Sequence, residues 1–159
     1  MKHKPKGDGI KIHGFYRIQL EDKDGKISGD SGWRENTIVN EGFDDFLVRL
    51  ISNTTDSKQI RYMALGTGGA PNVTHTSLPG EIMGSTKKVQ VTVSASNSKT
   101  CRFTATFNSS DRTVSYDISN IGLYDTSATN AQLFAGSDYA SSTAATNQNV
   151  NATYDIQFA

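Results

Sequence analysis

The sequence predicts a mainly β protein, an antiparallel β-sandwich or jelly roll of about eight strands with one amphipathic helix at about 41–52. Three observations lead to this prediction. Short segments in which apolar and polar residues alternate recur roughly every 10 to 15 residues. Clusters of Gly, Asn, Asp and Ser separate them, as turns require. A single segment has apolar residues at helical spacing.

The composition indicates one domain with a basic arm in front of it. The chain has 159 residues, which we divide into an arm at 1–9 and a β-sandwich domain at 10–159. Lys and Arg together number 16, as do Asp and Glu, so no overall charge bias favours nucleic acid or membrane as a partner. Cys101 is the only cysteine, which excludes an intrachain disulfide. The arm has no apolar segment behind it and is not expected to be a secretory signal.

The segment 60–71 is predicted to organise the fold. It has apolar residues on both faces, which is typical of a central strand, and it runs into a glycine-rich turn. Gly66, Gly68 and Gly69 are expected to allow positive φ angles and close backbone approach.

The chain before this segment contains a hairpin and the helix. Residues 10–20 alternate as a strand with a bulge or bend at Gly14, and the Asp-Gly pair that ends at Gly25 predicts a type I′ turn. Residues 26–38 return as a less regular strand. Asn40 is the expected helix cap. The helix has one apolar stripe that should plug one end of a sheet or cover one face, formed by Phe43, Phe46, Leu47, Leu50 and Ile51.

The chain after residue 87 is predicted to be almost entirely strands and turns. Residues 88–95 alternate, with Val89, Val91 and Val93 inward, and 101–107 follow as the next strand. Further strands are expected at about 114–124, 131–135 and 150–158. Residues 137–149 are polar and small, and predict a loop.

Several short motifs match catalytic or ligand-binding signatures only in part. Residues 29–32 share Gly-Asp-Ser-Gly with serine proteases but lack the flanking sequence, and 22–25 lack the later acidic ligand of a calcium loop. Residues 66–69 lack the Lys-Ser/Thr of a phosphate loop. His3, His13 and His75 have no partners at metal-ligand spacing. We therefore expect no catalytic residue, no metal and no cofactor, and predict that the protein is not an enzyme.

The candidate functional residues are sites of contact with a partner. Lys2, Lys4, Lys6 and Lys11 form a basic arm that could meet an acidic protein surface, the alternatives being a solubilising tail or a strand extension. No aromatic residues interleave with these lysines, so nucleic acid is not expected. The long loop at 71–86 and its approach are predicted to contact a partner. Its candidate residues are Thr67, Asn72 and His75.

The order of several segments resembles small structural proteins of tailed bacteriophages. The resemblance starts with the strand and Asp-Gly hairpin of 15–25, then Trp33-Arg-Glu-Asn36 and Asn40-Glu-Gly42. It continues with Leu65-Gly-Thr-Gly68 and a Pro-containing loop, then 118–124 and the last strand at 152–158. Ser119-Asn120 stands where this family often has an acidic residue. The resemblance covers about residues 14–159 and implies a non-enzymatic virion component, assembled in the host cytoplasm.

We consider three functional hypotheses for this sequence. The first is a capsid decoration or cement protein that binds the major capsid protein or other virion proteins, as a homo-oligomer or on the lattice. The second is a tail fibre, baseplate or adaptor component. The third is a carbohydrate-binding β-sandwich module, for which Trp33, Tyr124 and Tyr139 are the candidate aromatic residues.

Overall fold

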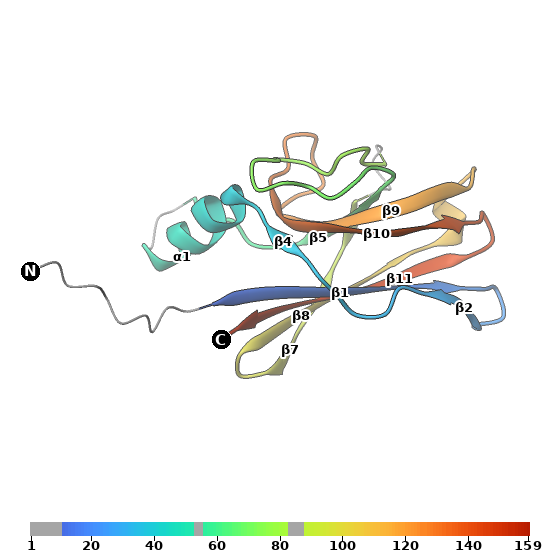
Figure 1. Cartoon of the computed structure of the whole chain (residues 1–159), viewed down its shortest axis with the longest axis horizontal. Helices are drawn as coiled ribbons and strands as arrows, with labels where there is room; N and C mark the ends of the chain where they lie inside the picture. The colour runs from blue at the N-terminus through green and yellow to red at the C-terminus, as the bar shows by residue number, and fades with distance from the viewer. Residues whose placement is uncertain (1–10, 53–55, 83–87) are drawn as a thin grey trace, which may run out of the picture.

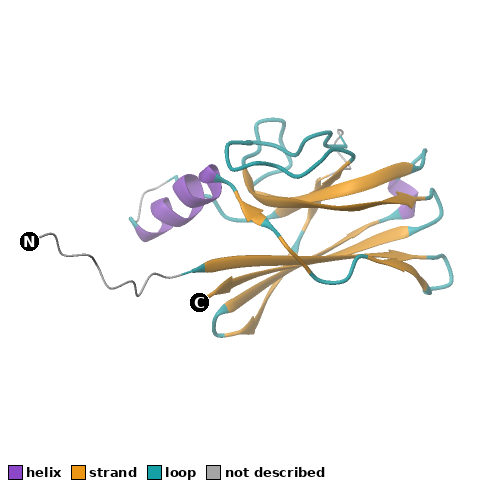
Figure 2. Cartoon of the chain, in the orientation of Figure 1, coloured by secondary structure: helices purple, strands orange, loops and turns teal. Residues whose placement is uncertain are grey.

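The computed structural model describes residues 11–52, 56–82 and 88–159 and shows two antiparallel sheets packed as a sandwich (Figures 1 and 2). A helix lies at the end of the sandwich where the first strand, β1 (Ile12–Glu21), begins and the chain ends, and a single 3-10 turn, η2 (Ser109–Asp111), lies farther along the chain. The predicted β-sandwich class is confirmed, whereas the jelly-roll connectivity stays a prediction.

The larger sheet, sheet A, contains the first and last strands side by side. Its order is β2-β1-β11-β8-β7, with β3 also pairing with β1, and each pair is antiparallel. Its strands are β1 (Ile12–Glu21), β2 (Ile27–Asp30), β3 (Arg34–Glu35), β7 (Thr92–Asn97), β8 (Thr100–Phe107) and β11 (Asn149–Phe158).

The second sheet, sheet B, has the order β4-β10-β9-β5-β6 and is also antiparallel. Its strands are β4 (Thr37–Ile38), β5 (Tyr62–Gly66), β6 (Lys88–Gln90), β9 (Tyr116–Tyr124) and β10 (Leu133–Ala144). β5 pairs with β9 on one side and β6 on the other, which confirms that this segment is a central strand.

The main core lies between the sheets. The inward positions of β1, β8 and β11 follow the predicted period of two, because successive side chains of a strand point to opposite faces. Sheet A contributes Tyr16, Ile18, Phe103, Phe107, Tyr154 and Ile156, and sheet B contributes Met63, Leu65, Ile118, Ile121, Leu123 and Phe134.

A second, smaller core lies on the other face of sheet B. It contains Val39, Ala64, Leu78, Tyr124, Ala131 and Leu133. Leu78 belongs to the loop that follows β5, so this loop packs over the sheet (Figure 1). Sheet B is therefore covered on both sides, which explains why β5 and β9 are apolar on both faces.

Gly66, the last residue of β5, and Gly68 allow close packing, whereas Gly69 has no close neighbour, and none of the three adopts positive φ. Positive φ occurs at Gly25, Gly32 and Gly80, so the prediction for Gly66, Gly68 and Gly69 was wrong on this point. A Cβ at Gly66 would collide with the Asn120 side chain, which confirms close approach at that position.

Two other predicted glycine features differ in the structure. The register of β1 with β11 is continuous through Gly14, so Gly14 forms no bulge there. It leaves room for the Asn36 side chain instead. In the first hairpin the Gly25 N–H donates to Asp22 O at 2.9 Å, so Lys23 and Asp24 are the central residues of the turn. Gly25 follows them with φ of 77°, the three-residue hairpin arrangement and not the predicted type I′ turn.

Two strand boundaries were also mispredicted. The segment 88–95 is divided between β6 in sheet B and β7 in sheet A, so Val91 is buried at the crossing while Val93 is half-exposed. The predicted polar loop at 137–149 is wrong, because β10 extends to Ala144. Ser142, Thr143 and Ala144 pair with β9, and this backbone pairing overrides the polar composition.

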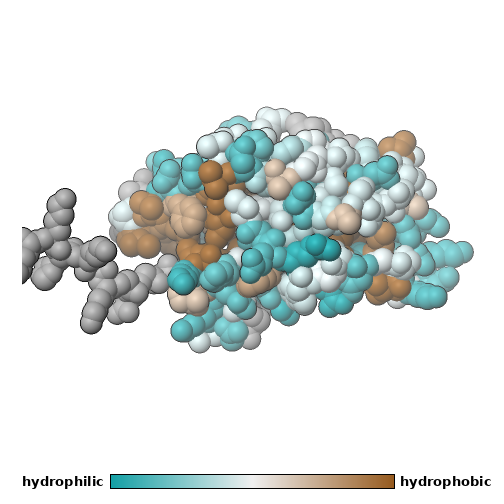
Figure 3. Space-filling view, viewed as in Figure 1, coloured by the Kyte–Doolittle hydropathy of each residue, from teal (hydrophilic) through white to brown (hydrophobic). Residues whose placement is uncertain are grey.

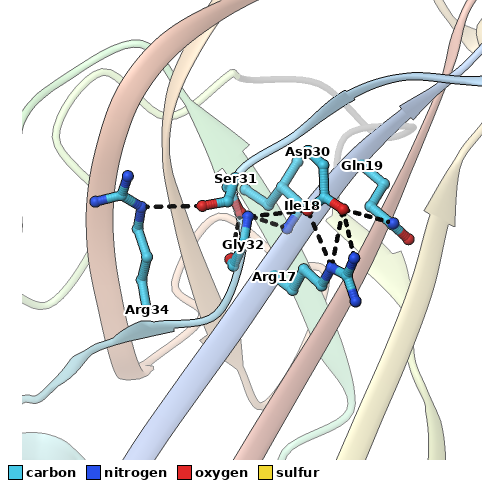
Figure 4. A network of polar contacts seen from close by, with 7 residues as sticks. All are labelled: Arg17, Ile18, Gln19, Asp30, Ser31, Gly32 and Arg34. Atoms are coloured by element: carbon cyan, nitrogen blue, oxygen red, sulfur yellow. Dashed lines mark hydrogen bonds and ion pairs between the residues drawn. The ribbon is translucent and has the colours of Figure 1, made fainter.

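Asp30 anchors the return of the first hairpin to β1. Its carboxylate accepts hydrogen bonds from Arg17 Nε (2.9 Å), Gln19 Nε2 (3.0 Å) and the Gly32 N–H (2.9 Å) (Figure 4). Ser31 continues the network, because its Oγ accepts from the Ile18 N–H at 2.9 Å and its carbonyl accepts from Arg34 Nε (Figure 4). The hydrogen bond from Arg17 holds the pKa of the Asp30 carboxyl well below its usual range.

We expect D30N to lower the melting temperature by about 2 °C at neutral pH, because exposed ion pairs contribute little. A carboxyl with a lowered pKa stabilises the fold above its unfolded pKa and loses this contribution as the pH falls below about 4. Thermal unfolding of wild type and variant from pH 7 to pH 2 should show the difference shrink at low pH. A constant difference would contradict a role for the charge.

Candidate interaction surfaces

The loop between β5 and β6 is fixed by polar side chains of β9. Asn120 is buried, and its Nδ2 donates to Gly69 O at 3.0 Å and to Pro79 O at 2.8 Å. Ser119 Oγ donates to Gly68 O at 2.7 Å. The two ends of the loop are therefore attached to one strand, which limits how far its tip can move.

The predicted loop residues lie in two different places. Asn72 and His75 meet in one turn, where the Asn72 N–H donates to His75 Nδ1 at 3.1 Å and the His75 N–H donates to Asn72 O at 3.1 Å. Thr67 instead bonds through its backbone N–H to Gly80 O at 3.0 Å. Thr67 and Asn72 are exposed and His75 is half-buried, so these residues remain candidates for contact without forming a single cluster.

A buried ion pair lies beneath the same loop. Lys88 Nζ is 2.5 Å from Glu81 Oε1, and their side chains are only 10% and 6% exposed. The Tyr124 hydroxyl donates to Glu81 and accepts from the Leu78 N–H at 2.7 Å. Burial, together with the neighbouring Glu81, raises the pKa of Tyr124 far above its usual value, which keeps the phenol protonated as the donor.

The arm is represented in the structure by Lys11 alone. Lys2, Lys4 and Lys6 lie outside the described residues. Lys11 is exposed and pairs with the last residue of the chain, with N–H···O distances of 2.7 and 2.8 Å to and from Ala159. The arm therefore joins the domain beside the C-terminus.

The helix has most of its apolar side chains exposed. It consists of η1 (Gly42–Val48), which has π-type hydrogen bonding, and α1 (Arg49–Ile51). Its buried apolar side chain is Phe46, which packs edge-on against Phe134 with ring centroids 5.2 Å apart. The exposed ones, here called the helix-end surface, are Phe43, Val48, Leu50 and Ile51. Figure 3 shows hydrophobic residues gathered at this end of the molecule.

The predicted burial of the whole stripe was therefore wrong, although the helix was predicted at the right place. The stripe was derived from a repeat of 3.6 residues, whereas π-type bonds run from i to i+5 and widen each turn. Leu50 is 63% exposed and Ile51 is 84% exposed, so neither side chain is buried in the core. Asn40 is also not the cap, because the residue before η1 is Glu41 and no side chain caps it.

An apolar groove of about 400 Å³ runs between the helix and the ends of sheet A strands. Its main apolar lining residues are Leu47, Leu50, Phe103, Phe134, Ile156 and Phe158. Lys58 lies at the groove and is paired with Asp125 at 2.9 Å. Phe158 is adjacent to Ala159, so the groove reaches the point where Lys11 and the arm begin.

One ion pair lies on the helix itself. Asp45 pairs with Arg49 at 3.0 Å, one turn along the helix. Burial raises the pKa of Glu41, and the nearby carboxylates of Asp45 and Asp125 raise it further. The Lys58–Asp125 pair at the groove and the Asp45–Arg49 pair on the helix hold these four charges beside one another, and the groove lining itself is mainly apolar.

The described residues contain no group of three or more His, Cys, Asp or Glu side chains that could hold a metal ion. Cys101 is half-buried, and burial raises the pKa of its thiol, so it is a weak nucleophile. No helix in the described part of the chain is long and apolar enough to cross a membrane.

The three aromatic residues considered for carbohydrate binding have different environments. Tyr124 is fully buried, and the Tyr139 hydroxyl is a buried group without a hydrogen-bond partner in the described structure. Trp33 is 47% exposed. Trp33 is therefore the one member of the three that could offer a ring face to a ligand.

The helix-end surface and its groove were not found by sequence reasoning, because their residues looked like an ordinary core-facing stripe. The available signal was Val48, an apolar residue outside the stripe, which makes the helix apolar over more of its circumference.

Comparison of the chain with protein-family models, curated proteins and solved structures gives no match.

Proposed function

We propose that the chain is a structural protein of a tailed-bacteriophage virion, a capsid decoration or cement protein that binds the outer capsid lattice. The observation that carries this proposal is the exposed helix-end surface beside the apolar groove. Contiguous apolar surface of this kind on a polar domain marks a site of protein contact. The order of motifs in the sequence resembles that of phage structural proteins, which supports a virion protein as the class of partner.

The proposed contact combines the groove with the arm. Leu50 and Phe158 line the groove, and Lys11 pairs with Ala159, the residue after Phe158. An apolar side chain of the capsid protein would fill the groove, and Lys11 with the other arm lysines would face capsid carboxylates. Exposed ion pairs add little individually, so burial of apolar surface in the groove supplies most of the affinity at each site. Many such sites repeat over the capsid lattice, which raises the overall avidity.

We expect the double substitution L50D/I51D to reduce occupancy on purified capsids at least tenfold, since two charges would have to be buried on binding. Both side chains are exposed in the isolated chain, so folding should be preserved. Occupancy is measured by quantitative gel of particles reconstituted with each variant. Circular dichroism checks that the fold is intact.

The control is V114D, which places a carboxylate at an exposed apolar residue that does not line the groove. It should bind as the wild type does. A chain lacking residues 1–9 tests the arm in the same assay. Full occupancy by L50D/I51D would overturn the groove as the docking site, and full occupancy by the truncated chain would remove the arm from the proposal.

The alternative placement is the phage tail, as a fibre, baseplate or adaptor component. The sequence resemblance applies equally to tail proteins, so copy number decides between them. Hundreds of copies per particle support the capsid lattice, whereas a handful supports the tail.

A further inference from the structure

Trp33 borders a shallow hollow on the outer face of sheet A. This hollow is more polar than the apolar groove. The hollow has a volume of about 340 Å³ and is lined by Phe15, Trp33, Arg102, Asp155 and Gln157. The Arg102 guanidinium lies over the Trp33 ring, 5.6 Å from its centroid. Trp33 is 47% exposed, so part of its ring stays open to solvent beside Arg102, Asp155 and Gln157.

The strand register explains why these residues meet. Phe15 on β1 is opposite Asp155 on β11, and Asp155 is opposite Arg102 on β8. The three side chains therefore form a row across adjacent strands, since directly paired residues point to the same face. Gln157 is two residues beyond Asp155 and shares that face. Trp33 immediately precedes β3, which pairs with β1 at Phe15.

The polar groups are held in place by one charge-assisted contact. Arg102 Nε and Nη2 donate to the two oxygens of Asp155 at 2.8 and 2.7 Å, a two-bond pairing that fixes both planes. The Asp155 side chain is 9% exposed, so the pair is anchored on its acidic side. In the described structure neither Arg102 Nη1 nor the Gln157 amide has a hydrogen-bond partner, and both belong to residues that line the hollow.

We infer that this hollow binds a neutral pyranose saccharide. One face of a pyranose ring is made of C–H groups and packs on an aromatic ring, while its hydroxyls both donate and accept hydrogen bonds. Trp33 supplies the part of its ring that Arg102 leaves uncovered, Gln157 supplies a donor and an acceptor, and Arg102 Nη1 supplies a further donor. This combination of one aromatic wall with a few fixed polar groups is what orients a small ligand.

The charge balance selects a neutral ligand over an acidic one. Asp155 accepts two hydrogen bonds from Arg102, so the positive and negative charges cancel within the hollow. An anionic sugar would bring a carboxylate close to Asp155 without gaining an unpaired cation. The inference does not depend on the virion proposal, because the hollow and the apolar groove share no lining residue.

The intrinsic fluorescence of the protein tests this directly. Trp33 is the only tryptophan in the chain, so its emission reports on this hollow alone. We would titrate the full chain with methyl glucoside, methyl galactoside, maltose and lactose, and with glucuronate as the acidic counterpart. At least one neutral sugar should shift the emission saturably with a Kd of about 1 mM, the weak affinity typical of a shallow site.

Ligand-observed NMR extends the test to variants, including W33A, which lacks the fluorescent reporter. Q157A should weaken binding about tenfold through loss of its hydrogen bonds, and W33A should abolish binding. The matched control is Q90A, which removes an exposed amide on β6 and should bind as the wild type does. Absence of saturable binding to all four neutral sugars would overturn the inference. So would tighter binding of glucuronate, or equal loss in Q157A and Q90A.

Discussion

We expect N120D to destabilise the protein by about 3 kcal/mol at neutral pH, the range for a buried charge without a partner. The two side chains differ only in that a carboxylate oxygen replaces the amide nitrogen. That nitrogen lies 3.0 Å from Gly69 O and 2.8 Å from Pro79 O, so the substitution sets negative oxygens against two carbonyl oxygens. Urea or thermal unfolding measures the loss.

The same variant should recover at low pH. A protonated aspartic acid can donate one hydrogen bond, which restores one of the two contacts with the loop. The carboxyl introduced by N120D would have a raised pKa in the folded state, so its destabilisation appears above the unfolded pKa of about 4 and disappears below it. N130D serves as the control, because Asn130 is exposed and its side chain should tolerate the charge at every pH. Equal stability of N120D and N130D at neutral pH would contradict the role assigned to Asn120.

Asn120 illustrates what a sequence can and cannot predict. The alternating pattern of 118–124 predicted a strand. Asn120 also stood out in the sequence, because the phage family that the chain resembles often has an acidic residue at this place. Its contacts reach Gly69 and Pro79, 51 and 41 residues earlier in the chain. No local period encodes such a pairing, so the loop's attachment to β9 could only be seen once the fold was known.

The strands were predicted best where burial alternates on one face. In β11, Val150, Ala152, Tyr154 and Ile156 are buried in turn, and the sequence showed that period directly. The prediction failed at Ser142 to Ala144, where the strand is held by pairing with β9 and its side chains are small and polar. The hydropathy of a segment does not reveal whether a neighbouring strand will form backbone hydrogen bonds with it.

The candidate surfaces could be predicted only in part. The spacing of apolar residues predicted where the helix lies. Which of its side chains are exposed depends on the π-type turns of η1 and on the packing of Phe46 against Phe134 of β10. Gly42, for example, lies directly against the Phe134 carbonyl, which fixes the helix start on the sheet. The hollow at Trp33 likewise requires three strands to come together in register, from positions 15, 102 and 155.

The buried Glu81–Lys88 pair leads to the second large expected effect. E81Q leaves the Lys88 ammonium buried without its counter-ion, and K88M leaves the Glu81 carboxylate with the Tyr124 hydroxyl as its remaining donor. Each single substitution should lower the free energy of unfolding by about 3 kcal/mol. The pair differs in this respect from the exposed Arg17–Asp30 pair, whose loss has a small effect because water solvates the remaining charge.

The double variant E81Q/K88M separates the charge pairing from the packing of the two side chains. With both charges removed, no buried ion is left unpaired. The double variant should therefore lose about 2 kcal/mol less free energy of unfolding than the sum of the two single losses. The Tyr124 hydroxyl still accepts from the Leu78 N–H and can donate to the glutamine oxygen, which keeps this part of the loop in place. Chemical unfolding of the four proteins completes the cycle. Strictly additive losses would mean that the two residues act through separate contacts, and that the loop over sheet B is held by Asn120 and Leu78 without help from this charge pair.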